Sequence, residues 1–308
     1  MEHLDFFANQ VVEAMLASGQ PGLETQSPVE ARKAFATGML AMQTPKTVIG
    51  AVTNLVADSA HGPIRMRMYR PSLTVPPNAA LPVIVFFHGG GFFLGDLDVF
   101  DGQCRRLCQA SKSAVISVDY RLAPEHKFPA ATDDAFAAIE WITMNAKSLG
   151  VDPNRLAVAG DSAGGNLAAV VCLMARDAGA PKISHQILLY PATNLRAEPV
   201  DGPFLTTALM RHFVSSYVKS DNERDHWRVS PALAENHVGL PPATIAVCGF
   251  DPLHDDGVGY GKTLRRAGVP VQVFSYPGQI HGFLLMDAAI PAAVTAIDEI
   301  GRHIQASL

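Results

Sequence analysis

The sequence Gly-Asp-Ser-Ala-Gly-Gly occupies residues 160–165 and is the most informative stretch of this 308-residue chain. It follows the apolar run Leu-Ala-Val-Ala at 156–159 and precedes a helix-like segment at 166–175. A strand, a sharp turn and a helix in this order form a nucleophile elbow, which lifts a serine hydroxyl above the sheet. The turn strains the serine backbone, and glycine on either side avoids a collision between a Cβ and the neighbouring strand or helix. Ser162 is therefore the candidate nucleophile.

Two partners for this serine follow later in the chain. A serine hydroxyl at neutral pH needs a base to remove its proton and an acid to orient that base. After such an elbow the partners come in the order Ser, Asp or Glu, His, each behind a later strand. The apolar run at 243–248 leads into Asp251, and a second run at 269–274 leads into His281, which a glycine follows. This order predicts Asp251 as the acid and His281 as the base.

Other titratable side chains near these positions have simpler explanations. His254 follows closely after Asp251, at the expected start of a helix that directs it away from the serine. Asp255 and Asp256 are alternative acids, but carboxylates in the first turn of a helix interact favourably with its dipole. We expect these two carboxylates to cap the helix.

His-Gly-Gly-Gly at 88–91 supplies backbone N–H groups for a developing negative charge. It follows the strongly apolar run at 82–87, which indicates a buried strand. Amides that are already in place stabilise the oxyanion of an acyl-transfer reaction without reorganisation. We expect the amides of Gly89, Gly90 and Ala163 to bind this oxyanion.

Five motifs in this order resemble those of the bacterial hormone-sensitive-lipase-like carboxylesterases of the α/β-hydrolase superfamily. They lie at residues 88–96, 119–126, 160–165, 251–253 and 281–283. The resemblance implies that Ser162, Asp251 and His281 form a catalytic triad beside an oxyanion hole. It also implies hydrolysis of esters with short to medium acyl chains, and such a mechanism requires no metal or organic cofactor.

Strand-length apolar runs predict the architecture. They fall near residues 47–57, 62–70, 82–87, 114–119, 155–160, 185–190, 243–248 and 270–275. From the third run onward they alternate with helical patterns, which indicates a mostly parallel sheet with helices on both faces. The first two runs, separated by a turn at 58–62, are expected to form an antiparallel hairpin at one edge. We therefore expect an α/β-hydrolase fold with eight strands.

Two helical segments have no place in this sheet. Residues 1–42 have the pattern of two amphipathic helices, and a further helix is expected at 204–219. Apolar helix faces need a surface to cover, and the cleft at the C-terminal ends of the strands provides one. We expect 1–42 and 195–235 to form a helical cap over one catalytic domain, which comprises residues 43–194 and 236–308. Candidates for the substrate pocket, or for ordinary cap packing, are Phe92, Phe93, Leu205, Leu209, Phe213 and Phe283.

Composition excludes some classes of binding partner. The net charge of −5 offers no basic surface for nucleic acid. The N-terminus carries acidic residues where a secretory signal carries basic ones, and no apolar stretch reaches the length of a membrane span. We expect a cytoplasmic protein that acts on a small-molecule ester, with no nucleic-acid partner and no membrane span. Pairing through the eighth strand could give a homodimer.

Two further patterns resemble sites but lack the required spacing. Cys104 and Cys108 lie close together, but no second cysteine pair or nearby histidine completes a zinc site. We expect free thiols and no metal site. Gly-Val-Gly-Tyr-Gly-Lys-Thr at 257–263 resembles a phosphate-binding loop, but its first glycine is one residue too close to the lysine.

Two other functions could use the same features. An amidase or a lactone hydrolase could use the same triad, because the pocket sets the substrate. A non-catalytic small-molecule receptor is the alternative from a different class. The plant gibberellin receptors resemble this family but lack the histidine base, so His281 argues against a receptor.

Overall fold

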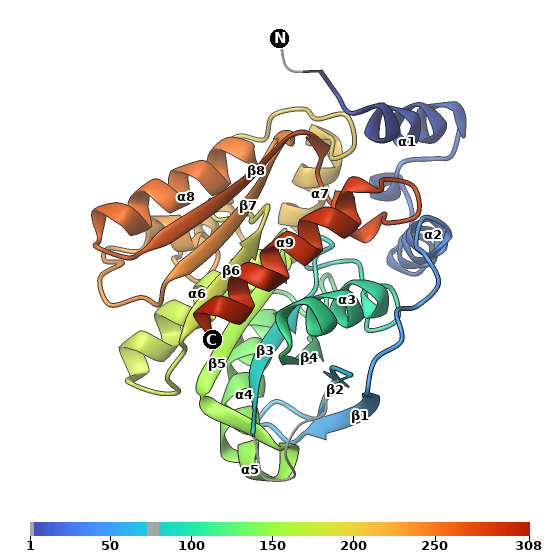
Figure 1. The fold of residues 1–308 in the computed structure, drawn as a ribbon. Helices are drawn as coiled ribbons and strands as arrows, with labels where there is room; N and C mark the ends of the chain where they lie inside the picture. Colours follow the sequence, from blue (N-terminus) through green and yellow to red (C-terminus); the bar gives the residue numbers. More distant parts are fainter. Residues whose placement is uncertain (1–2, 73–79) are drawn as a thin grey trace.

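The computed structural model describes residues 3–72 and 80–308 (Figure 1). Eight strands form one sheet in the order β1-β2-β4-β3-β5-β6-β7-β8. They are β1 (Ala51–Ala57), β2 (Ile64–Arg70), β3 (Leu81–Phe87), β4 (Ala114–Asp119), β5 (Val151–Asp161), β6 (His185–Leu189), β7 (Ala243–Phe250) and β8 (Val271–Ile280). Each predicted apolar run corresponds to one of these strands, so the expected eight-stranded sheet is confirmed.

Strand pairing explains the two kinds of sequence pattern. β1 pairs with β2, and β2 with β4, in antiparallel orientation, so the predicted hairpin at the sheet edge is confirmed. The other neighbours are parallel. β3 is buried along almost its whole length, because helices cover both faces of the parallel part. The sequence of such a strand is therefore continuously apolar, whereas the sequence of the partly exposed β2 alternates between apolar and polar residues.

Helices pack on both faces of the sheet (Figure 1). They are α3 (Asp101–Ser111), α4 (Ala130–Met144), α5 (Ala146–Leu149), α6 (Ala163–Ala178), α8 (His254–Arg266) and α9 (Ala292–Ser307). Buried side chains of α4, α6 and α8 form one apolar core with the sheet, and those of α3 and α9 form a second core. The stretch 257–263 lies within α8, which excludes the loop that phosphate binding would need. All four cysteines are buried free thiols, as expected.

The segments outside the sheet fold as the predicted helices. The N-terminal segment contains α1 (Phe6–Ala17), the short η1 (Leu23–Thr25) and α2 (Pro28–Ala41), and a later segment contains α7 (Thr207–Tyr217). Short 3₁₀ turns complete the structure, namely η2 (Asp221–Asp225), η3 (Pro231–Leu233) and η4 (Phe283–Leu285). Local sequence explains where α2 begins, because Ser27 and Glu30 form a reciprocal capping box and Pro28 occupies the first helical position.

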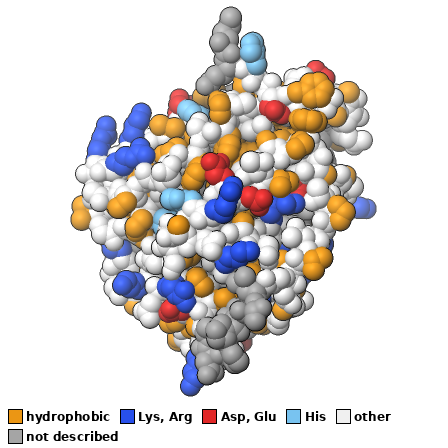
Figure 2. Space-filling model, in the orientation of Figure 1, with side chains coloured by type: hydrophobic (Ala, Val, Ile, Leu, Met, Phe, Trp, Pro, Cys, Tyr) orange, Lys and Arg blue, Asp and Glu red, His pale blue; other side chains and the backbone are white. Residues whose placement is uncertain are grey.

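The surface is mixed in character. On the face shown in Figure 2, Lys and Arg side chains are scattered among acidic and apolar ones. Apolar side chains gather over α1, where Phe6 is 66% and Leu16 is 72% exposed. Among the helices of the described residues, none is both long enough and apolar enough to cross a bilayer.

Candidate active site

Ser162 occupies a strained turn between β5 and α6. Its backbone has φ 54° and ψ −117°, a conformation that residues other than glycine rarely adopt. Its N–H donates to the carbonyl of Leu189 at 2.8 Å, which ties the turn to β6. A Cβ at Gly160 would collide with the backbone of Gly164, and a Cβ at Gly164 would collide with the carbonyl of Phe87. The glycines predicted around the elbow are therefore required by close backbone packing.

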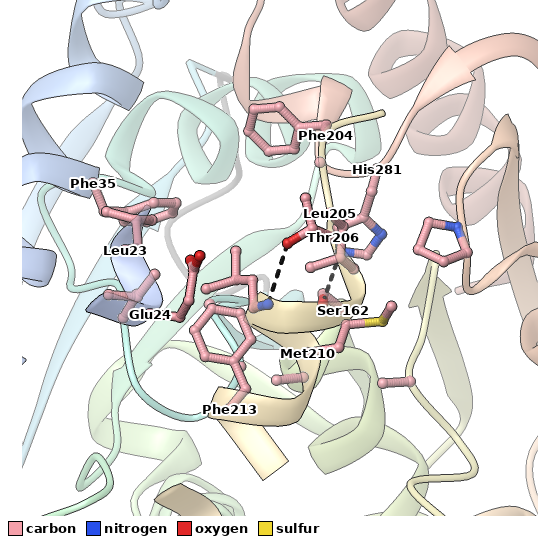
Figure 3. A pocket seen from close by; sticks show the side chains of 18 of the residues that line it. Leu23, Glu24, Phe35, Ser162, Phe204, Leu205, Thr206, Met210, Phe213 and His281 are labelled. Carbon is pink, nitrogen blue, oxygen red and sulfur yellow. Dashed lines mark hydrogen bonds between the residues drawn. The ribbon is translucent and has the colours of Figure 1, made fainter. Parts of the chain in front are cut away.

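The structure brings Ser162, His281 and Asp251 together. His281 Nε2 lies 2.9 Å from Ser162 Oγ (Figure 3). His281 Nδ1 lies 2.8 Å from Asp251 Oδ2. Asp251 Oδ1 accepts a further hydrogen bond from the N–H of Leu253 at 2.8 Å, which fixes the carboxylate. An ionised carboxylate only accepts, so it selects the tautomer with the proton on Nδ1. Nε2 is then free to accept the proton of the serine hydroxyl.

The alternative acids and base lie elsewhere. His254 Nδ1 is 2.9 Å from Oδ1 of Asp255, whose side chain is fully exposed on α8. Asp256 is partly buried and accepts hydrogen bonds from the N–H groups of Thr193 at 2.7 Å and Asn194 at 3.0 Å. Asp255 and Asp256 both lie in the first turn of α8, the position predicted for them, and the Asp256 carboxylate also holds the loop after β6.

The oxyanion amides differ by one residue from those expected. The N–H of Gly89 donates to Asp161 Oδ1 at 2.7 Å, so the role expected for Gly89 is wrong. Gly90 and Gly91 line the same cleft as Ser162, with φ of 107° and 63°. Within the described part of the chain, neither of their N–H groups has a hydrogen-bond acceptor. Ala163 begins α6, where N–H groups lack intrahelical partners. The amides available to an oxyanion are thus those of Gly90, Gly91 and Ala163.

Asp161 is a buried carboxyl between the elbow and the glycine motif. Burial raises its pKa to about 7, although the hydrogen bond from Gly89 opposes this rise. The folded protein therefore holds the proton of Asp161 more tightly than the unfolded chain does. For such a group, the free energy of unfolding falls as the pH rises from 3.8 to about 7, and the loss is complete above that range.

Replacing Asp161 by asparagine should remove this loss. The amide oxygen can still accept from Gly89, and no charge is buried at high pH. We expect the variant to exceed the wild type only slightly near pH 4.5, and at pH 8 by a free energy of unfolding on the order of a few kcal/mol. Thermal unfolding midpoints at both pH values measure this, with the exposed Asp177→Asn as control. An equal difference at the two pH values would contradict the assignment.

A large apolar cleft lies beside Ser162. Its volume is about 2150 Å³, and four of the six predicted pocket residues line it, namely Phe92, Leu205, Leu209 and Phe213. Figure 3 shows Leu23 and Phe35 of the N-terminal segment across the cleft from Ser162 and His281. The cleft is therefore bounded by the glycine motif, by the segment around α7 and by the N-terminal helices.

Two predicted pocket residues lie in the protein interior instead. Phe93 is 1% exposed and packs with Ala31 and Leu94. Phe283 is fully buried, and its ring lies 5.3 Å from that of Tyr276. Prediction from sequence missed the residues that α1, η1 and α2 contribute to the cleft, among them Phe7, Val11, Leu23, Phe35 and Met39. Their amphipathic pattern indicated a covering role but not which side chains reach the cleft.

Comparisons with known proteins agree with this geometry. The family model of the alpha/beta hydrolase fold matches residues 84–285. Esterase LipI of Mycobacterium tuberculosis is 45% identical over 252 residues, which cover 80% of this chain and 78% of the relative. Ethyl acetate hydrolase of Pseudomonas putida is 33% identical over 311 residues, which cover 96% of each chain.

Solved structures extend the likeness to nearly the whole chain. A hyperthermophilic esterase from the archaeon Pyrobaculum calidifontis superimposes with a TM-score of 0.92 at 38% identity, covering 99% of this chain and 98% of that one. The five motifs, the sheet and these relatives agree, and the chain belongs to the α/β-hydrolase fold family, in its hormone-sensitive-lipase-like group.

Proposed function

We propose that this protein is a serine carboxylesterase that hydrolyses small carboxylic esters through an acyl-enzyme on Ser162. The observation that carries the proposal is the hydrogen-bonded chain from Ser162 Oγ through His281 to Asp251, with distances of 2.9 and 2.8 Å. Relatives named esterase and carboxylesterase support the same reaction class.

In the acylation step, Ser162 Oγ attacks the carbonyl carbon of the ester while His281 Nε2 takes the hydroxyl proton. Asp251 stabilises the imidazolium that forms. The N–H groups of Gly90, Gly91 and Ala163 stabilise the negative charge on the carbonyl oxygen. His281 then gives its proton to the leaving alcohol, and the acyl group remains on Ser162.

In the deacylation step, a water molecule replaces the alcohol. His281 removes a proton from this water as it attacks the acyl carbon, and the same amides stabilise the second oxyanion. Collapse of the intermediate returns the proton to Ser162 Oγ and releases the carboxylic acid. Every proton transfer uses the one imidazole, so its orientation by Asp251 matters in both steps.

The substrates that fit this site best have short to medium acyl chains. The cleft wall is largely apolar and is formed in part by α1, α2 and α7. We therefore propose that residues 1–42 and 195–235 act as a cap, which shields the acyl group from water and limits its length. The relative named ethyl acetate hydrolase supports small esters. A homodimer paired through the edge strand β8 and a cytoplasmic location stay predictions.

A substrate panel tests the proposed function. We expect hydrolysis of p-nitrophenyl esters to be fastest from butyrate to octanoate and to fall for longer chains, as the resemblance to carboxylesterases of short to medium acyl chains implies. Matched p-nitroanilides should react far more slowly, and a faster anilide reaction would favour an amidase. A phosphonate probe should label Ser162 stoichiometrically. No turnover of any ester, together with no labelling, would favour a receptor and contradict the proposal.

A further inference from the structure

The segment 119–126, Asp-Tyr-Arg-Leu-Ala-Pro-Glu-His, has no part in the mechanism above, although it is one of the five motifs. It lies against the oxyanion loop, which we define as residues 88–94. The N–H of Ala123 donates to the carbonyl of Phe92 at 2.8 Å, and the hydroxyl of Tyr120 donates to the carbonyl of His88 at 2.7 Å. The segment thus supports the oxyanion loop from the side away from the cleft.

Arg32 of α2 joins this segment to the oxyanion loop. Its Nε donates to the carbonyl of Phe93 at 2.9 Å, and its Nη2 donates to the carbonyl of Ala123 at 2.8 Å. The remaining face of the guanidinium pairs with both oxygens of Glu125, at 2.8 and 2.6 Å. One side chain therefore donates hydrogen bonds to three residues on two segments that lie far from it in sequence.

The Arg32 guanidinium suits this role by its shape. Its donors form a rigid planar fork, so the direction of one hydrogen bond fixes the directions of the others. The hydrogen bond from Arg32 lowers the pKa of Glu125, so this carboxylate stays charged and orients the fork. The side chain of Arg32 is 28% exposed, and such an ion pair contributes little to global stability. Arg32 matters for geometry, because one of its backbone acceptors lies in the oxyanion loop and the other in the segment that supports this loop.

Apolar packing joins the same elements. Ala31, the residue before Arg32, is fully buried against Phe93 and Leu94. On the cleft side of the loop, a Cβ at Gly91 would collide with the ring of Phe213 from α7. The loop that carries the Gly90 and Gly91 amides is thus held between α2 and α7.

We infer that Arg32 is a positioning residue for catalysis, which holds the oxyanion loop in the conformation where the amides of Gly90 and Gly91 face Ser162. This inference rests on the proposed esterase function. It assigns to α2 a part in stabilising the transition state, beyond its contribution to the cleft wall.

A role in the transition state and a role in the cleft wall predict different kinetics. Within the described part of the chain, Arg32 is not among the residues that line the cleft, whereas its neighbours Lys33 and Ala34 are. If removal of Arg32 displaces the loop, kcat should therefore fall while KM stays nearly unchanged. Loss of a wall contact would raise KM instead.

Steady-state hydrolysis of p-nitrophenyl butyrate by Arg32→Met tests this directly. We expect kcat to fall by about tenfold to a hundredfold, because a small displacement of catalytic groups has an effect of this size. Arg32→Lys should recover only part of the loss, since one ammonium cannot reproduce the planar fork. Arg155→Met is the matched control, because Arg155 also bridges a carboxylate and a carbonyl, those of Asp152 and Ala80. It lies in the N-terminal half of β5, whereas Ser162 follows the C-terminal end of this strand.

Two inhibitors of the same chain length distinguish binding of the oxyanion from binding to the rest of the site. An alkyl trifluoromethyl ketone adds to Ser162 and places an oxyanion in the hole, whereas an alkyl methyl ketone occupies the cleft largely without adding. We expect Arg32→Met to weaken binding of the trifluoromethyl ketone by about the same factor by which kcat falls, because such analogues report transition-state binding. The methyl ketone should bind equally well to both proteins.

The outcomes distinguish this inference from the function on which it rests. Equal weakening of both ketones, or a raised KM with kcat unchanged, would overturn the positioning role and leave the esterase function intact. The same would follow if Arg155→Met lost as much kcat as Arg32→Met. A wild-type protein that hydrolyses no ester would overturn both proposals.

Discussion

Replacement of Ser162 by alanine is expected to lower kcat for ester hydrolysis by about 10⁶-fold, as for other serine triads. The hydroxyl is the group that becomes acylated, and no other hydroxyl, thiol or amine among the described residues is hydrogen-bonded to His281. Without this hydroxyl, no acyl-enzyme can form. Hydrolysis of p-nitrophenyl butyrate under saturating conditions measures the loss.

The residual rate of Ser162→Ala is informative in itself. The amides of Gly90, Gly91 and Ala163 remain in place, and such an oxyanion site with substrate binding retains about 10³-fold to 10⁴-fold acceleration over water. Ser148→Ala, an exposed position on α5, serves as the control and should keep full activity. If Ser162→Ala kept more than a few per cent of wild-type activity, the acyl-enzyme mechanism would be wrong.

The sequence predicts the strands, and the meeting of three side chains that follow them, for a topological reason. Parallel strands end at the same edge of a sheet, so residues that follow separate strands meet there. Ser162 after β5, Asp251 after β7 and His281 after β8 are brought together in this way. Each could be identified from a short local pattern, because the fold supplies the long-range contact.

The errors concern choices that depend on contacts between distant segments. A run of three glycines does not show which amide is already occupied, and the partner of Gly89 is Asp161, from a different strand. Likewise, Phe283 follows His281 closely, but the turn η4 directs its ring into the core. The contribution of α1 and α2 to the cleft depends on how these helices dock, and amphipathic periodicity does not specify docking.

Replacement of Asp251 by asparagine is expected to lower kcat by about 10⁴-fold, even though the side chain keeps its shape. The Asp251 side chain is fully buried, and its two oxygens have different partners. Oδ1 accepts from the N–H of Leu253, so the amide oxygen of asparagine should take that position and the NH₂ group should face His281 Nδ1. The amide would donate to Nδ1 and move the ring proton to Nε2. The imidazole would then present a proton, instead of a lone pair, to Ser162.

A tautomer defect has a signature that simple unfolding lacks. We expect Asp251→Asn to keep KM and the thermal unfolding midpoint close to wild type, while phosphonate labelling of Ser162 slows in proportion to kcat, since both reactions need the same base. Asp255→Asn is the matched control: it lies near Asp251 in sequence, its carboxylate is fully exposed, and it should leave kcat unchanged. Because acylation and deacylation both use His281, pre-steady-state measurements should show both steps slowed. A loss of less than tenfold in kcat, or an equal loss in Asp255→Asn, would show that another group orients His281.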